Sequence, residues 1–333
     1  MPIQSLTRRT LLRSTVATST LLAMPAIARG QGKTVVRWGE LLPTTHPQVQ
    51  MIDMIAKEVA VKTAGRIEIQ SFPAGQLGAG KDMIESVVTG NLTMTTDGGA
   101  AIGQFLPQIS LIEAPYLWRD AAHMAKGLGS GILDDMNKTL VEKRGMRMLM
   151  PTYYGKRHLT TRDKPVKNAD DMKGFKLRVP PVDTFKAMAE AWGARPTPIA
   201  FPELYLALSQ GAVDGQENPL PTIQSGKFQE VQKFLVMTGH IITPRLVLVN
   251  EAFWKALAAG DRDVLMAAIK AGAAWQDTEL GKQEANLVDT FKKAGMTVID
   301  PDLESFRKPV VASVPKLFEE KWGKGQYDKL AAM

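Results

Sequence analysis

The chain of 333 residues contains no cysteine, and it also lacks long apolar runs. Without cysteine it can form no disulfide, hold no metal through thiolate ligands and use no cysteine nucleophile. No stretch reaches the roughly 18 uncharged apolar residues that a membrane-spanning helix needs, so we expect a soluble mature protein. The length exceeds one ordinary domain and is natural for two.

Common catalytic and metal-binding motifs are missing as well. The four histidines stand apart, without the i, i+4 pair of a zinc-binding helix: His46, His123, His158 and His240. Gly129-Ser130-Gly131 lacks the first glycine of a nucleophile elbow, and Gly78-Ala79-Gly80 lacks the third glycine of a dinucleotide-binding motif. An enzyme is not excluded, but it would have only three loose acid–base candidates: Asp82, Asp97 and Glu217.

One glycine-rich segment, Gly75 to Asp82, has the spacing of a phosphate-binding loop as far as Lys81. Asp82 stands where a serine or threonine hydroxyl would hold magnesium, and its carboxylate would repel a triphosphate. The segment therefore predicts a plain turn that leads into a helix over residues 82–89.

The N-terminus has the pattern of an export signal. Arg8 and Arg9 precede an apolar run over residues 16–24, and Ala26-Ile27-Ala28 supplies the small residues that a signal peptidase accepts. The segment resembles a twin-arginine signal. We therefore expect residues 1–28 to be removed by cleavage near Ala28 and the mature chain to lie in a bacterial periplasm.

The charge distribution argues against a nucleic-acid partner. The net charge of +7 falls to +4 when the three arginines of the leader are left out. The other basic residues are scattered among acidic ones, without a run of five or more, which is typical of a solvated surface.

Hydrophobic periodicity predicts an α/β fold. Strands are predicted over residues 34–39, 66–72, 92–96, 146–150, 246–249 and 297–299, and helices over 48–63, 82–89, 121–140 and 228–234. The opening strand–helix–strand order favours a parallel sheet. The longest helical pattern, residues 261–293, would extend about 50 Å, which is long enough to span two lobes.

Residues 173–220 place polar groups at the ends of two short strands, 173–180 and 213–220, with a short helix over 201–211 between them. Because neighbouring side chains of a strand point to opposite faces, Arg178 is directed away from the face that buries Leu177 and Val179. Ligands of open α/β sheets bind at strand ends. This stretch is therefore the first candidate for a binding site.

The chemistry of the candidate groups suits an organic acid. They are two arginines, an amide and three aromatic residues: Arg157, Arg178, Asn218, Tyr153, Tyr154 and Phe201. An arginine fork takes a carboxylate through two parallel hydrogen bonds, each contributing roughly 1.5–3 kcal/mol.

Residues 173–180 and 200–220, the latter ending Val213-Asp214-Gly215-Gln216-Glu217-Asn218-Pro219, resemble the signature segments of the solute-binding receptors of tripartite ATP-independent periplasmic (TRAP) transporters. Within this family, the chain is similar to the sialic-acid-type members. It extends over the mature chain and includes Gly75-Gln76-Leu77-Gly78, Pro115-Tyr116 and Val231-Gln232-Lys233-Phe234.

The resemblance implies a two-lobed α/β fold of the periplasmic-binding-protein type. Each lobe would be a mixed β-sheet flanked by helices, with the long helix spanning both. We expect lobe I to comprise residues 33–154 and 244–283, and lobe II residues 155–243 and 284–333. The receptor would be a monomer without cofactor or metal, closing on a monocarboxylate and delivering it to the small and large membrane subunits of a permease.

The resemblance also implies roles for individual residues. Arg178 takes the position of the carboxylate-binding arginine, Asn218 that of the asparagine beside it, and Arg157 that of the second pocket arginine. Phe201 corresponds to a pocket aromatic. Asp82 is a weaker expectation, because it lies in a turn that corresponds to the pocket edge.

One departure bears on the ligand. Sialic-acid receptors carry a glutamate where this chain has Gly98, which favours a different acid. Asp97 can accept hydrogen bonds from ligand hydroxyls, as a sugar acid such as a hexuronate would require. An aromatic or branched 2-oxo acid is the alternative, with Tyr153 and Tyr154 as its stacking surface.

Overall fold

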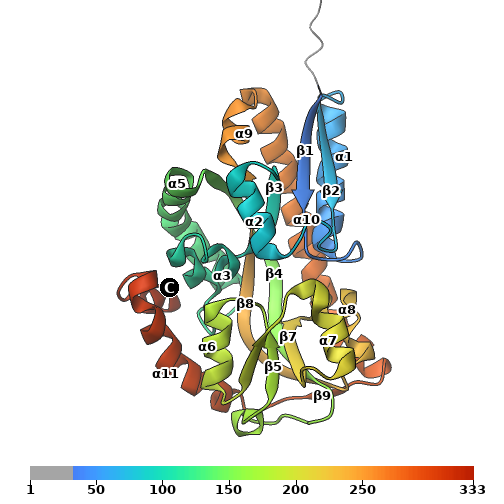
Figure 1. Ribbon diagram of the computed structural model, residues 1–333, viewed down its shortest axis with the longest axis vertical. Helices are drawn as coiled ribbons and strands as arrows, with labels where there is room; N and C mark the ends of the chain where they lie inside the picture. The colour runs from blue at the N-terminus through green and yellow to red at the C-terminus, as the bar shows by residue number, and fades with distance from the viewer. Residues whose placement is uncertain (1–32) are drawn as a thin grey trace, which may run out of the picture. The chain divides into compact units, whose positions relative to one another are not determined.

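The structure of the protein is a computed structural model that describes residues 33–333. The leader predicted over residues 1–28 lies outside the described residues. The described chain forms two lobes, which three long elements join (Figure 1).

The strands form one nine-stranded mixed sheet in the order β2-β1-β3-β8-β4-β7-β5-β6, with β9 paired to β8. Their bounds are β1 Thr34–Gly39, β2 Ile67–Phe72, β3 Met94–Gly98, β4 Met146–Thr161, β5 Lys176–Val179, β6 Arg195–Pro198, β7 Gly215–Pro219, β8 Phe234–Asn250 and β9 Thr297–Ile299. The pair β1–β2 is parallel, as the opening strand–helix–strand pattern predicts.

Helices cover the sheet in both lobes (Figure 1). The α-helices are α1 Pro47–Lys62, α2 Gly80–Thr89, α3 Gly99–Ile102, α4 Ala121–Gly127, α5 Leu133–Arg144, α6 Asp183–Ala191, α7 Leu204–Gln210, α8 Leu220–Ser225, α9 Glu251–Ala256, α10 Ala259–Lys293, α11 Leu303–Trp322 and α12 Gln326–Ala331. The shorter turns are η1 Pro107–Glu113, η2 Leu128–Ile132, η3 Ala169–Met172, η4 Phe201–Glu203 and η5 Phe228–Glu230.

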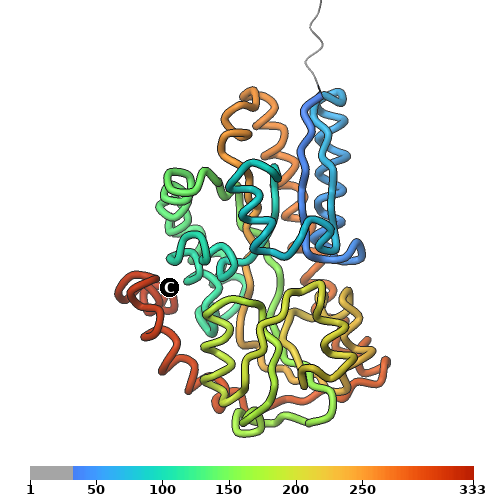
Figure 2. The backbone as a smooth tube through the Cα atoms, viewed as in Figure 1, coloured from blue at the N-terminus to red at the C-terminus, as the bar shows by residue number. Residues whose placement is uncertain are grey.

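Strands β4 and β8 run through both lobes as an antiparallel pair, and Figure 2 shows both crossing from one group of elements to the other. They are 16 and 17 residues long. The register shifts between Met148 and Met150 and between Tyr153 and Gly155. Gly155 has φ of +128°, a conformation that glycine adopts without strain. These irregularities bend the strands at the junction between the two lobes.

Helix α10 contacts elements of both lobes, α1 in one and α8 and β9 in the other. Its 35 residues extend about 52 Å. Gly272 allows a close approach to α1, because an added Cβ there would lie 2.8 Å from Cγ1 of Ile55. The expected long helix that spans both lobes is confirmed.

Several sequence-based element boundaries are wrong. The sequence predicts strands over 146–150 and 246–249, but β4 and β8 are far longer, because the bulges and the prolines Pro151 and Pro244 hide the alternation. The helix expected over 228–234 is only the turn η5, and Phe234 already begins β8. The helix expected over 121–140 is interrupted at Gly131, which has φ of +90°.

The C-terminal helices contact both lobes. Tyr327 donates a hydrogen bond to the carbonyl of Pro115, and Trp322 donates one to Ser110. Helix α11 packs against α6 of the other lobe. Because α11 and α12 contact both lobes, they do not belong clearly to lobe II as expected. The lobe boundaries given above therefore remain a proposal.

Candidate ligand-binding site

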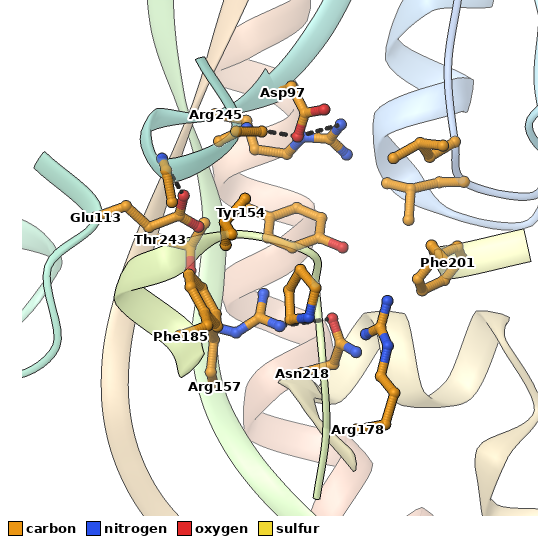
Figure 3. Close-up of a pocket in the computed structure, with 17 residues that line it drawn as sticks. Asp97, Glu113, Tyr154, Arg157, Arg178, Phe185, Phe201, Asn218, Thr243 and Arg245 are labelled. Carbon is orange, nitrogen blue, oxygen red and sulfur yellow. Dashed lines mark hydrogen bonds and ion pairs between the residues drawn. The ribbon is translucent and has the colours of Figure 1, made fainter. Parts of the chain in front are cut away.

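A cavity of about 550 Å³, its mouth included, lies between the lobes beside β4 and β8. The charged and amide side chains that line it are Asp97, Glu113, Arg157, Arg178, Asn218 and Arg245 (Figure 3). Aromatic and aliphatic walls complete it: Leu41, Leu42, Tyr154, Val182, Phe185 and Phe201.

Arg178 lies on β5, whose neighbours β6 and β7 bury it to 2% exposure. Nε and Nη2 of Arg178 both donate to the carbonyl of Ile199, at 2.9 and 2.7 Å. No carboxylate of the described residues lies within 4.0 Å of this guanidinium. The edge formed by Nη1 and the second hydrogen of Nη2 is therefore left for a ligand.

Burial lowers the pKa of Arg178 to about 10, with Glu217 opposing and Arg157 adding to the shift. The group still carries its proton at neutral pH. A buried guanidinium without a carboxylate partner is unfavourable in the empty protein, and an anion at its free edge would relieve that cost. The position is therefore suited to a carboxylate ligand.

Arg157, on β4, is held by a buried carboxylate on the neighbouring strand β7. Its Nε lies 2.5 Å from Oε2 of Glu217, and its Nη2 donates to Oε1 of Glu217 at 2.8 Å and to Oδ1 of Asn218 at 3.0 Å. Burial disfavours the ionised form of Glu217, but Arg157 and His240 outweigh it and lower its pKa. Arg157 is thus charge-compensated and acts as a positioned hydrogen-bond donor.

Asn218 lies between the two arginines in Figure 3. It accepts from Arg157 through Oδ1, and its Nδ2 donates to Oε1 of Gln216 at 2.6 Å. A side-chain amide has two N–H donors, so one remains for a ligand. Arg178, Asn218 and Arg157 together form a wall of donors.

The opposite wall centres on Arg245 of β8. Its Nη1 lies 3.0 Å from Oε1 of Glu40, and its Nη2 lies 3.7 Å from Oδ1 of Asp97 and also donates to the carbonyl of Thr96. Burial raises the pKa values of Glu40 and Asp97, with Arg245 opposing the shift in both. Two carboxylates therefore share one arginine here.

Glu113, at the end of η1, lines the same side of the cavity. Its Oε2 accepts from the backbone N–H of Ala100 at 2.9 Å. Burial raises the pKa of Glu113 to about 7, with Arg157 opposing the shift. At neutral pH this carboxyl group is therefore divided between its neutral and ionised forms.

Tyr154 and Phe201 form the wall between the two polar sides. The Tyr154 ring stacks on His46 at 5.5 Å between centroids, and its hydroxyl accepts from Thr222 at 2.8 Å. Phe201 packs against the cluster of Leu42 and Tyr154. These contacts join elements of both lobes around the cavity.

Six of the seven site residues predicted from the sequence line this cavity: Asp97, Tyr154, Arg157, Arg178, Phe201 and Asn218. Asp82 does not. Its side chain is exposed, and its Oδ2 accepts from the backbone N–H of Ala79 at 3.1 Å, at the start of α2. Its carboxylate takes part in a helix cap, so a contact between Asp82 and the ligand remains a prediction from the resemblance.

Sequence reasoning missed Glu113 and Arg245. Each is a lone charged residue within an apolar stretch, Ile109 to Ala114 for Glu113 and Ile241 to Val249 for Arg245. A charge in a segment that is otherwise buried requires a partner or a function. A single charged residue in an apolar stretch could therefore have identified both Glu113 and Arg245 as candidates.

No group of three or more His, Asp or Glu side chains within residues 33–333 is arranged to hold a metal ion. Over the same range, none of the helices combines the length and the apolar character of a membrane span.

The residues that line the cavity define a cleft between two lobes that offers hydrogen-bond donors on one side and acceptors on the other. This is the arrangement of a binding protein for a small organic acid.

Comparisons with known proteins place the chain in a family. The family model described as bacterial extracellular solute-binding protein, family 7 (DctP), matches residues 38–321. The sialic acid-binding periplasmic protein SiaP of Vibrio cholerae is 35% identical over 330 residues, which cover 98% of this chain and 100% of that protein. The chain belongs to the DctP family of TRAP solute-binding proteins.

Solved structures agree with this assignment. A TRAP periplasmic solute-binding protein from Polaromonas, bound to D-erythronate, has a TM-score of 0.85 at 34% identity and covers 90% of this chain and 99% of its own. The sugar acid binding protein DctPAm from Advenella mimigardefordensis, in complex with galactonate, also has a TM-score of 0.85, at 26% identity, covering 90% and 97%. The family consists of extracytoplasmic receptors for small acids that work with membrane permease subunits, and its members are not enzymes.

Proposed function

We propose that this protein is the periplasmic receptor for a hydroxylated monocarboxylate, with a sugar acid such as a hexuronate as the best candidate. The observation that carries the proposal is the buried guanidinium of Arg178, which faces the cavity and has no carboxylate partner among the described residues. The carboxylate of the ligand would pair with its free edge, and Asn218 and Arg157 would donate to the same group.

The far side of the cavity supports a ligand rich in hydroxyl groups. Asp97, Glu113 and Thr243 line it and can accept hydrogen bonds. The relatives named above bind sialic acid, D-erythronate and galactonate, each a carboxylic acid with several hydroxyl groups. Chemistry and similarity therefore favour the same class of ligand.

The alternative of an aromatic or branched 2-oxo acid has less support. Tyr153 does not line the cavity, because its hydroxyl donates to Glu284 of α10 at 2.8 Å. Tyr154 already stacks on His46, and the Arg245 guanidinium lies 5.1 Å from the same ring. The proposed stacking surface is thus occupied by the protein itself.

Closure of the two lobes would exclude water and strengthen the bond between arginine and carboxylate. His46 and Thr222 approach across the lobes, with 3.3 Å between Nε2 and Oγ1. The closed receptor would then deliver the ligand to the small and large subunits of a permease. We further propose that it acts as a monomer, exported by a twin-arginine leader that is cleaved near Ala28.

Calorimetric titration with sugar acids, dicarboxylates and aromatic acids tests the proposed function. We expect a sugar monocarboxylate to bind with micromolar affinity or better, which corresponds to about 8 kcal/mol. Mass spectrometry of the recovered ligand separates a receptor from an exported enzyme. A chemically altered ligand, or no binding of any hydroxylated monocarboxylate, would overturn the proposal.

A further inference from the structure

Glu113 offers the cavity a carboxylate oxygen that the protein does not use. Its Oε2 is engaged by the backbone of Ala100, whereas Oε1 has no hydrogen-bond donor among residues 33–333. Glu113 is buried, with 4% of the residue exposed to solvent. Its side chain lines the cavity on the side away from Arg178 (Figure 3). An acceptor in this position can take a hydrogen bond from a hydroxyl group of the ligand.

Gly98 makes room for this carboxyl group. A Cβ added at position 98 would overlap Oε2 of Glu113 and would lie 2.8 Å from Oε1 and Cδ. The backbone at Gly98 is extended, with φ of −74°, so any residue could adopt it. The glycine is therefore explained by space, and the carboxylate in this part of the cavity comes from Glu113.

Asp97 adds a second acceptor beside it. Oδ1 of Asp97 accepts from the N–H of Gly98 at 2.8 Å, and Oδ2 has no donor in the described part of the chain. The Arg245 guanidinium is closer to Glu40, at 3.0 Å, than to Asp97, at 3.7 Å. Arg245 is thus shared by Glu40 and Asp97, and together with Glu113 this side of the cavity has three carboxyl groups to one arginine.

The cavity is therefore polarised. Arg178 is the cation without a carboxylate partner on one side. On the other side Glu113 has no cation within 4.0 Å among residues 33–333, and Asp97 shares Arg245 with Glu40. A ligand with one carboxylate and a chain of hydroxyl groups matches both sides. A ligand with carboxylates at both ends would place its second charge against acids of the same sign.

We propose that Glu113 is a specificity-determining residue: its Oε1 accepts a hydrogen bond from a hydroxyl group at the far end of the ligand, and its charge excludes ligands that carry a second carboxylate there. The inference rests on the proposed function, because it takes the first carboxylate to lie at Arg178. It concerns the choice among acids, whereas the proposed function concerns the binding of a hydroxylated acid at all.

The test compares aldonates with the aldarates of the same configuration, which differ only in a terminal CH₂OH that becomes a carboxylate. Galactonate with galactarate, and gluconate with glucarate, are suitable pairs, and hexanoate serves as the six-carbon acid without hydroxyl groups. In calorimetric titration at pH 8, where Glu113 is mostly ionised, we expect wild-type protein to bind its preferred aldonate at least tenfold more tightly than the matching aldarate and at least a hundredfold more tightly than hexanoate.

Glu113→Gln removes the charge and retains the shape of the side chain. We expect it to weaken aldonate binding by no more than about tenfold and to reduce the preference over the aldarate by at least tenfold. Glu85→Gln, an exposed substitution on α2, is the matched control and should leave the ratio unchanged. Retained aldonate binding shows that the Glu113→Gln protein is folded.

The outcomes separate the two proposals. If no aldonate or other hydroxylated monocarboxylate binds, the proposed function fails. If the tightest-binding monocarboxylate is a hexuronate, it takes the place of the aldonate and is compared with the aldarate of the same configuration. If wild-type protein binds that aldarate or hexanoate within tenfold of the preferred monocarboxylate, the inference about Glu113 fails and the proposed function stands. The inference also fails if Glu113→Gln and Glu85→Gln give the same aldonate-to-aldarate ratio.

Discussion

Replacing Arg178 by alanine should abolish most of the affinity for the acid while the fold persists. The free edge of this guanidinium can make two charge-assisted hydrogen bonds to a carboxylate, each contributing roughly 1.5–3 kcal/mol. Arg157 and Asn218 remain as donors, so we take the lower end of the sum, about 3 kcal/mol. That loss corresponds to roughly a 150-fold increase in Kd.

Two further variants sharpen this experiment. Arg178→Lys keeps a positive charge but loses the planar fork, so its affinity should lie between those of wild type and Arg178→Ala. Arg195→Ala, on the exposed side of the neighbouring strand β6, is the matched control and should bind normally.

Isothermal titration calorimetry gives the Kd values, and circular dichroism without ligand checks the fold. Arg178 donates twice to the carbonyl of Ile199, so the alanine variant should melt somewhat lower even without ligand. The reasoning is refuted if Arg178→Ala binds the acid within tenfold of wild type.

Two other predictions concern pH and the backbone of β4. Burial raises the pKa of Glu113 to about 7, and an ionised carboxylate accepts a hydroxyl hydrogen bond more strongly than a neutral one, so ligand binding should lower that pKa. Calorimetry should therefore show that the affinity of the wild-type protein for an aldonate rises between about pH 6 and 8, whereas that of Glu113→Gln stays constant. A wild-type affinity that falls with rising pH would contradict the role of Glu113 as an ionised acceptor. Gly155→Ala should destabilise the protein by about 2–3 kcal/mol in urea unfolding, because φ is +128° and the new Cβ would lie 2.7 Å from Cβ of Pro219. Gly174→Ala, at φ +74° with open space around it, should cost only about 1 kcal/mol, and equal losses would show that the contact with Pro219 is unimportant.

Local sequence patterns were sufficient for elements that are regular from end to end. The alternation over residues 34–39 predicts β1 with its observed bounds, and the apolar spacing over 261–293 predicts α10 to within two residues. Strands β4 and β8 could not be predicted in full length. Their bulges and prolines interrupt the two-residue period, and their continuation is stabilised by pairing with each other, which is a contact between distant segments.

The candidate site divides in the same way. Arg178 and Asn218 stand at predicted strand ends, where ligands of open α/β sheets bind, whereas the role of Arg157 is implied by the family resemblance; all three side chains line the cavity. The pairing of Arg157 with Glu217, and of Arg245 with Glu40, depends on the tertiary fold and leaves Arg178 as the arginine that faces the cavity without a carboxylate. Neither pairing can be predicted from local sequence, because each joins residues that are 60 or more positions apart in the chain.

A crystal structure of the protein with its tightest-binding hydroxylated acid tests the central claim most directly. We predict that the carboxylate of the ligand lies on the Nη1 and Nη2 edge of Arg178, within hydrogen-bond distance of Asn218, and that its hydroxyl groups face Asp97 and Glu113. A carboxylate bound at Arg245, or a ligand that leaves Arg178 without an anion, would contradict the account.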